Sequence, residues 1–284
     1  MDKHLLVTVS EQNSALFGVK FVGNFFTNKK KMHLTLYYSH PRASLSWDDA
    51  MGKKLQAKQK TKYEAGGRKA LEEAKKECLN QGFKDDQVSF KLELRKGSKV
   101  MDILNEGAQG NYDAVVLGRR GVTWLEEAFD ESVTKGFLKK KFDFPVWLCK
   151  NPETSRKNVL LCVDGSEASN RIADHVGFIL QDEIQQDVTI FIAGKNPGQA
   201  ENIISSVRSD LLKNGLPEAR LTIMTVPEKN ASKAILGEYK KNKYSAVAVG
   251  RRNIEQKGLK KMFLGSVSTR LYNELEGASL WICY

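Results

Sequence analysis

The sequence predicts an α/β fold made of two tandem five-stranded parallel-sheet domains that are related by a pseudo-twofold axis. This prediction depends on two observations. The chain contains the same series of sequence blocks twice, which indicates two copies of one domain. Within each copy, apolar β-like runs alternate with amphipathic helical segments, which is typical of a parallel sheet covered by helices on both faces.

The repeat consists of three blocks that occur in the same order in both copies. The matching ranges are 3–26 with 157–180, 112–121 with 244–253, and 145–150 with 279–284. A polar stretch that contains Pro152 separates the copies. We therefore predict two domains, residues 1–150 (the first half) and residues 157–284 (the second half).

Each element of the second half is predicted from a local pattern. Short apolar runs bounded by turn residues predict strands, and apolar residues at helical spacing, such as Ile172, Val176 and Ile179, predict helices. The expected strands are 158–163, 187–194, 220–226, 245–250 and 278–284, and the expected helices are 167–181, 198–215, 230–242 and 265–275. The first half repeats this order, with a long helical stretch rich in Lys and Glu at 48–80.

The last strand of each half is apolar and is predicted to lie at a sheet edge. Exposed apolar edges favour pairing with another strand. We therefore expect the segments 145–150 and 279–284 to pair with each other as an internal pseudo-dimer. The alternative is that Trp147 and Trp281 only fill the core of their own half. The sequence leaves open whether two chains pair further into a homodimer.

The charge of the chain is strongly positive and unevenly distributed. The formal net charge of the 284 residues is +11, and the first half holds 27 Lys and Arg against 19 Asp and Glu. Basic surfaces attract nucleic acids, but lysine runs such as 29–31 and 139–141 are also typical of solvated helix faces. Aromatic positions for base stacking are not evident in the lysine-rich segments, so we do not expect nucleic acid as the main partner, and a nucleic-acid or polyanion binder that uses the basic first half is the last of the alternatives.

Other broad functional classes are not indicated by the sequence. No apolar run approaches the length of a membrane span, and the start "MDKHLLVTVS" lacks a cleavable signal pattern, so we expect no membrane partner and a cytoplasmic location. The four cysteines and four histidines are dispersed, which predicts buried thiols and no metal site. No catalytic triad can be assigned by spacing.

Three segments of the second half are predicted to meet where parallel strands end. They are Val163-Asp164-Gly165-Ser166 after the first strand, the segment from Gly250 to Asn253 after the fourth, and the segment from Gly265 to Ser268 at the last helix. Glycines permit close approach of a ligand, helix starts favour anions, and a carboxylate accepts hydrogen bonds from a ribose hydroxyl or an adenine amine. An alternative interpretation is that Asp164 and Ser266 are helix caps.

At these segments the chain resembles the universal stress protein family over both halves. The strings "VDGSEASNRIADHV", "AVAVGRRN" and "FLGSVSTRL" are similar to the blocks of that family. The resemblance implies a Rossmann-like, nucleotide-binding-like fold, pairing through the fifth strand, and ATP, with Mg²⁺, as the expected cofactor. It implies these cofactor-binding residues: Val163, Asp164, Val249, Gly250, Arg252, Asn253, Gly265, Ser266 and Val267. In this reading Val163 and Val249 wall the base, and the residues from Gly250 onward surround the phosphates.

Neither half matches the ATP-binding pattern of the family completely. That pattern is Gly, two residues, Gly, nine residues, then Gly-Ser or Gly-Thr. The second half has Asn253 in place of the second glycine and a spacer of eleven residues before Gly265. The first half keeps Gly118 and Gly121 but has Glu131 before its serine.

The first half is also altered after its first strand, where Ser10 corresponds to Asp164. A carboxylate at position 131 repels a phosphate, and the change to serine removes the proposed acceptor. We therefore expect the first half to have lost nucleotide binding and the second half to keep it.

These features favour a stress-response regulatory protein that binds ATP or a related adenine nucleotide in its second half. Efficient catalysis is not indicated, and slow ATP hydrolysis is the most that the resemblance implies. The alternative is a scaffold of the same fold that binds no nucleotide and acts through protein partners. Arg251 and Arg252 could contact phosphate, lie on the surface, or link the halves.

Overall fold

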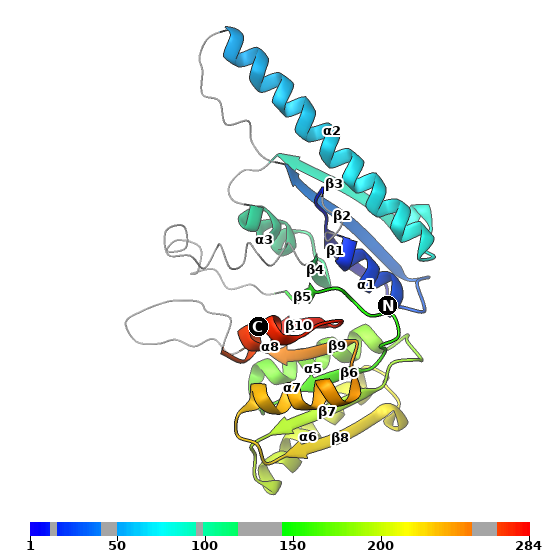
Figure 1. Cartoon of the computed structure of the whole chain (residues 1–284). Helices are drawn as coiled ribbons and strands as arrows, with labels where there is room; N and C mark the ends of the chain where they lie inside the picture. Colours follow the sequence, from blue (N-terminus) through cyan, green and yellow to red (C-terminus); the bar gives the residue numbers. More distant parts are fainter. Residues whose placement is uncertain (12–15, 41–49, 95–98, 119–143, 252–265) are drawn as a thin grey trace.

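A computed structural model describes residues 1–11, 16–40, 50–94, 99–118, 144–251 and 266–284 (Figure 1). Ten strands form one continuous sheet in the order β3-β2-β1-β4-β5-β10-β9-β6-β7-β8. The strands are β1 (Lys3–Thr8), β2 (Met32–His40), β3 (Val88–Leu94), β4 (Ala114–Gly118), β5 (Val146–Cys149), β6 (Val159–Cys162), β7 (Val188–Ala193), β8 (Leu221–Val226), β9 (Ala246–Gly250) and β10 (Ser279–Cys283). The helices are α1 (Phe17–Phe25), α2 (Ala50–Asn80), α3 (Lys99–Gln109), α5 (Glu167–Leu180), α6 (Pro197–Lys213), α7 (Ala231–Asn242) and α8 (Ser266–Glu274).

The two halves of the sheet have the same topology. Neighbouring strands are parallel within each half, and in each half the first strand lies between the second and the fourth. The predicted α/β class with a mostly parallel sheet is therefore confirmed. One sheet continues through both halves, so the division into domains 1–150 and 157–284 stays a prediction.

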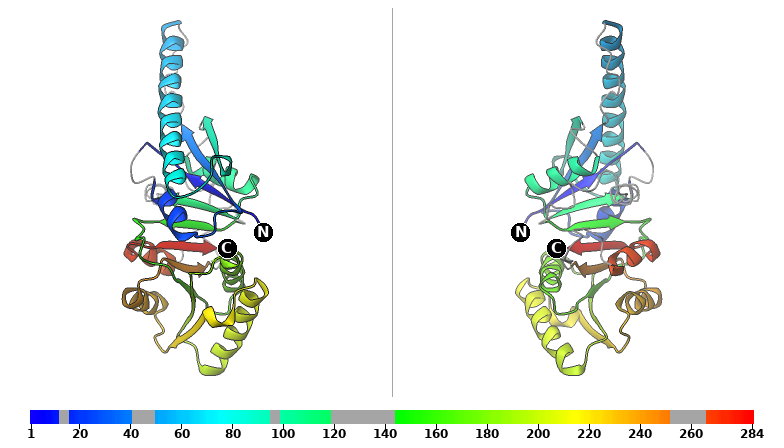
Figure 2. Two further views of the ribbon diagram at one scale, coloured as in Figure 1. Left: turned by 90° about the vertical axis from the view of Figure 1, so that its right-hand side faces the viewer. Right: turned by 90° about the vertical axis from the view of Figure 1, so that its left-hand side faces the viewer.

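Helices cover both faces of the sheet (Figures 1 and 2). Side chains of α1, α2, α5 and α6 belong to one buried apolar cluster, which contains residues of both halves. Side chains of α3, α7 and α8 belong to the cluster on the opposite face. This alternation follows from the period of two along each strand: Leu5 and Val7 belong to the first cluster, and Leu6 belongs to the second.

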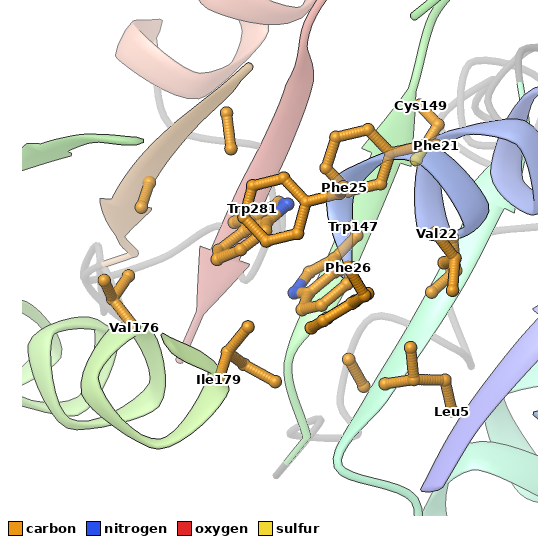
Figure 3. Close-up of a cluster of buried hydrophobic side chains, with 14 of the residues drawn as sticks. Leu5, Phe21, Val22, Phe25, Phe26, Trp147, Cys149, Val176, Ile179 and Trp281 are labelled. Carbon is orange, nitrogen blue, oxygen red and sulfur yellow. The ribbon is translucent and has the colours of Figure 1, made fainter. Parts of the chain in front are cut away.

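The halves join at a seam formed by the antiparallel pairing of β5 with β10. Trp147 lies opposite Trp281 in this pairing. Their rings stack with centroids 4.2 Å apart and planes inclined by 8°. Phe21 and Phe25 of α1 approach the Trp281 ring edge-on (Figure 3). The predicted pairing of the two final strands is confirmed, and both tryptophans are fully buried in a core that the halves share.

Buried polar groups also link the halves. The Glu183 carboxylate, 2% exposed, accepts hydrogen bonds from Thr27 N (2.9 Å), Thr27 Oγ1 (2.6 Å) and Asn28 N (3.2 Å). Lys3 Nζ donates to Asp182 Oδ2 at 3.2 Å. The three donors around Glu183 compensate its removal from water, which a buried carboxylate requires.

Helix α2 is much longer than the part of it that packs on the sheet. Ala70, Leu71, Ala74 and Cys78 are buried against the first half. The amino-terminal part projects beyond the ends of the neighbouring strands (Figures 1 and 2). From residue 57 to residue 66 no residue is buried.

The described part of the chain also bears on the predictions about membranes and cysteines. None of its helices combines the length and the apolar character that crossing a membrane requires. All four cysteines are buried and none forms a disulfide, as the sequence predicts.

Candidate functional site

The candidate site lies at the carboxyl ends of β6 and β9. These strands are parallel neighbours, with Cys162 opposite Val249. The chain continues from β6 to β7 on one side, whereas β9 lies on the other side of β6. This is the point where the strand order reverses, and in open α/β sheets ligands bind in the crevice at that point.

Asp164 follows β6 in a tight turn that leads into α5. Its Oδ1 accepts hydrogen bonds from Ser166 N (3.0 Å) and from Ser169 Oγ (2.7 Å), and its own N donates to Ser169 Oγ (2.9 Å). Gly165 has φ +82°, a backbone conformation that favours glycine. The carboxylate is therefore held in one orientation at the end of the strand, half-buried.

The same turn caps α5. Ser166 is the N-cap residue, and its Oγ accepts from Ser169 N at 3.3 Å. Asp164 is therefore not the helix cap that the alternative interpretation predicted, although its hydrogen bonds to Ser166 and Ser169 order the same turn. Ser169, 2% exposed, was not singled out in the sequence. A signal for Ser169 was present in the sequence. Its hydroxyl lies three residues after Ser166, at the start of the amphipathic segment, which is the spacing at which side chains at a helix start interact.

Gly250 is required by packing at the end of β9. A Cβ at this position would lie 2.4 Å from both the carbonyl carbon and the carbonyl oxygen of Ala168 in α5. No larger residue fits unless the helix moves. The close approach that the sequence predicted for this glycine is therefore an approach of the α5 backbone, whether or not a ligand binds nearby.

Val163 and Val249 do not face a common space. Each is 5% exposed, but Val163 belongs to the apolar cluster under α5 and α6, and Val249 to the cluster under α7 and α8. The expectation that both residues wall one base stays a prediction, and it would require a ligand that reaches both faces of the sheet end. The physical reason for the opposite orientations is the strand alternation: Val249 pairs with Cys162, and Val163, one residue later, points to the opposite face.

Several predicted residues lie outside the described part of the chain. These are Arg252, Asn253 and Gly265, and in the first half Gly121, Glu131 and Ser132. Helix α8 begins at Ser266, whose side chain is also outside the description, and Val267 packs half-buried against the second cluster. The expected phosphate loop therefore stays a prediction.

Arg251 contacts the residues at the end of β10 through both its backbone and its side chain. It is 6% exposed, and its N donates to Cys283 O at 2.7 Å. Its guanidinium donates to the Tyr284 hydroxyl and lies over that ring, with Cζ 4.6 Å from the centroid. Burial raises the pKa of Tyr284, and the neighbouring Arg251 opposes this rise. The sequence left open a phosphate contact, a surface position or a link between the halves for this arginine. The observed contact is a different one, and it lies within the second half.

The corresponding position in the first half lacks a carboxylate. Ser10 follows β1 as Asp164 follows β6. Its Oγ is buried and has no hydrogen-bond partner among the described residues. The next residue, Glu11, accepts from Tyr38 Oη at 2.7 Å. The first half therefore presents a hydroxyl where the second half presents an oriented carboxylate.

The described arrangement suits hydrogen-bond recognition. A fixed carboxylate at a strand end can accept from hydroxyl or amine groups of a ligand. Among the described residues, no group of three or more His, Cys, Asp or Glu could hold a metal ion.

Comparisons with known proteins give a consistent result. A family model described as the universal stress protein family matches residues 1–150. The chain is similar to the crystal structure of a universal stress protein from Archaeoglobus fulgidus, with a TM-score of 0.65 and 15% identity over 99% of this chain and 95% of that chain. It is also similar to a functionally unknown protein from Pseudomonas aeruginosa PAO1, with a TM-score of 0.50 and 12% identity over 99% of this chain and 92% of that chain. No curated protein sequence matches significantly.

At such low identities the solved structures show the shared fold alone. The family model carries the assignment, because it covers more than half of the chain. It matches the first half, whereas the motifs that carry the sequence resemblance lie in the second half. The chain belongs to the universal stress protein family.

Proposed function

We propose that this chain is a stress-response regulatory protein that binds ATP or a related adenine nucleotide in its second half, without efficient catalysis. The observation that carries the proposal is the position of the Asp164 turn, at the end of β6, where the strand order reverses between β7 and β9. A carboxylate at this strand end, fixed by two donors on Oδ1, supports recognition of a ribose hydroxyl or an adenine amine.

The phosphate groups of the nucleotide are assigned to the segments after β9 and at the start of α8. The proposed contacts are Gly250, Arg252, Asn253, Gly265, Ser266 and Val267. Free amide groups at a helix start favour anions, which supports this assignment. Mg²⁺ would accompany ATP and neutralise part of its charge.

The first half is proposed to have lost this site. Its remaining role in the proposal is to pair with the second half through β5 and β10, as the other member of the pseudo-dimer. Ser10 supplies no carboxylate, and Glu131 would repel phosphate. One nucleotide per chain is the direct consequence of the proposal.

The test is a calorimetric titration of the nucleotide-free, full-length chain with MgATP, for wild type, D164N and D164A. Asparagine keeps an oxygen that accepts from Ser166 N and Ser169 Oγ, so D164N preserves the α5 turn, while it removes the charge and replaces the second acceptor oxygen by an NH2 donor. We expect one site per chain, and a weakening of roughly tenfold to a hundredfold in D164N, as for loss of a hydrogen bond to a charged group. The control variant S10A leaves binding unchanged.

The other outcomes each have a definite meaning. Two sites per chain would show that the first half is active, and unchanged affinity in D164N would remove Asp164 from the site. Absence of heat with every adenine nucleotide would favour the second candidate, a scaffold that acts through a protein partner. One observation favours that candidate: turn formation explains Asp164 and helix packing explains Gly250, so neither residue requires a ligand.

A further inference from the structure

The projecting part of α2 carries a one-sided row of lysines. Lys54, Lys58 and Lys62 are exposed and four residues apart, which places them on one face of the helix. We call residues 54–62 the lysine arm. In the sequence, residues 50–63 hold five lysines and no acidic residue.

Most of the lysine arm is exposed, although Gln59 is half-buried and its Oε1 is buried without a hydrogen-bond partner among the described residues. Packing against the sheet begins at Gly67, where a Cβ would lie 2.8 Å from Tyr38 and Leu92 side-chain atoms. Lys60 pairs with Glu64 at 3.8 Å. Within the part of the chain that the structure describes, Lys54, Lys58 and Lys62 form no ion pair.

This arrangement is unfavourable for an isolated helix. Like charges four residues apart repel each other, and a helix segment without a packed face lacks the contacts that stabilise most helices in proteins. A partner that supplies closely spaced negative charge would remove the repulsion.

We propose that the lysine arm binds the phosphate backbone of double-stranded nucleic acid. Lys54 and Lys62 are about 12 Å apart along the helix axis at a rise of 1.5 Å per residue. A DNA duplex carries one charge per roughly 1.7 Å of its axis, so all three lysines find phosphates within that length. The charge of the first half already allowed a nucleic-acid partner as a lower-ranked alternative, but the sequence did not show that this lysine run stands clear of the sheet.

The composition of the arm distinguishes this partner from others. Helices that lie in a membrane surface have a bulky apolar face, whereas the sequence of the lysine arm, "KLQAKQKTK", has a single bulky apolar residue, Leu55. Single strands are held by stacking on aromatic side chains, and the same segment has none. A duplex requires only positive charge on an accessible helix, which is what the arm presents.

The test measures binding of the full chain to a fluorescent DNA duplex of mixed sequence at 50 to 200 mM salt. The test variant is K54Q/K58Q/K62Q, and the matched control, K229Q/K240Q/K241Q, removes three exposed lysines from the second half. Glutamine keeps helix propensity, and circular dichroism verifies that the helix content is unchanged. Three phosphate contacts correspond to a decrease in affinity of roughly 40-fold over this salt range.

We expect the arm variant to lose at least tenfold in affinity at 50 mM salt, and its salt slope to decrease by about 2.7. The control keeps the slope of the wild type. Absence of duplex binding, or equal losses in both variants, would overturn the proposal. Binding to phosphatidylserine vesicles that depends on the arm, without duplex binding, would overturn it in favour of a membrane surface.

Discussion

The indole Nε1 of Trp147 donates a hydrogen bond to Nε2 of His175 at 3.0 Å across the seam. The equivalent atom of Trp281 is buried and has no hydrogen-bond partner in the described part of the chain. The repeat explains this difference, because the residue that corresponds to His175 in the first half is Phe21, which has no acceptor. The seam is thus symmetric in its apolar packing and asymmetric in its hydrogen bonding.

Replacing His175 by phenylalanine is expected to destabilise the protein by about 1–3 kcal/mol, because it leaves Trp147 Nε1 buried without an acceptor. Urea unfolding measures the change. The double variant H175F/W147F removes both partners and is the control. If H175F costs as much in the W147F background as in wild type, the hydrogen bond contributes nothing.

His175 also makes the stability depend on pH. Burial lowers the pKa of His175 from 6.5 to about 3. Above pH 6.5 the ring is neutral in both states, and below it the unfolded chain takes up a proton that the native protein excludes. Below pH 6.5 the free energy of unfolding therefore decreases by about 1.4 kcal/mol per pH unit, which amounts to about 2 kcal/mol at pH 5 relative to neutral pH. Unfolding of wild type and H175F at pH 7.5 and 5.0 should show this difference, and equal pH dependence would contradict it.

Two glycines provide a matched pair for packing. Gly250→Ala forces a Cβ against the Ala168 backbone and is expected to cost about 1–3 kcal/mol. Gly237 lies within α7 and has no atom near a built Cβ, so Gly237→Ala should stabilise by about 0.5–1 kcal/mol. Thermal unfolding compares the two variants. A neutral Gly250→Ala would mean that α5 shifts at no cost.

Glu183 is expected to be the most sensitive polar position at the seam. Glu183→Ala leaves Thr27 N, Thr27 Oγ1 and Asn28 N without their acceptor and should cost about 1–3 kcal/mol. Glu183→Gln keeps an acceptor oxygen and should cost less. The control is Glu201→Ala on the exposed side of α6, expected within about 0.5 kcal/mol of wild type. An equal effect at both positions would contradict the role of Glu183.

The cysteines are expected to be unreactive in the native protein. Burial raises the pKa of Cys78 and of Cys149 to about 12, and it also raises the pKa of Cys162 and of Cys283. Since the thiolate is the reactive form, a disulfide reagent at pH 8 should label no thiol within minutes and four thiols in guanidinium chloride. One rapidly labelled thiol in the native state would show that the chain opens locally.

Much of the fold could be predicted from the sequence, because the repeat and the hydrophobic periodicity are local signals. The helix expected at 167–181 is observed as Glu167–Leu180, and the strand expected at 187–194 as Val188–Ala193. The pairing of 145–150 with 279–284 was also predictable, since two apolar edges in one chain favour each other.

The remaining features depend on contacts between distant residues. The Glu183–Thr27 link joins residues with no shared pattern, and the projection of α2 depends on where the neighbouring strands end. At the candidate site, the turn at Asp164 was predictable from its glycine and serines. The opposite orientations of Val163 and Val249 were not, because a one-residue offset between neighbouring strands decides them.

The antiparallel pairing of β5 with β10 has a consequence for the seam as a whole. If two separate chains paired through such edges, the fraction paired would depend on protein concentration. Here the two edges are tethered in one chain, so their pairing is intramolecular and dilution does not open it. Tethering also lets the two sides diverge, because a change on one side is not copied onto the other. Trp147 can therefore face His175 while Trp281 faces Phe21.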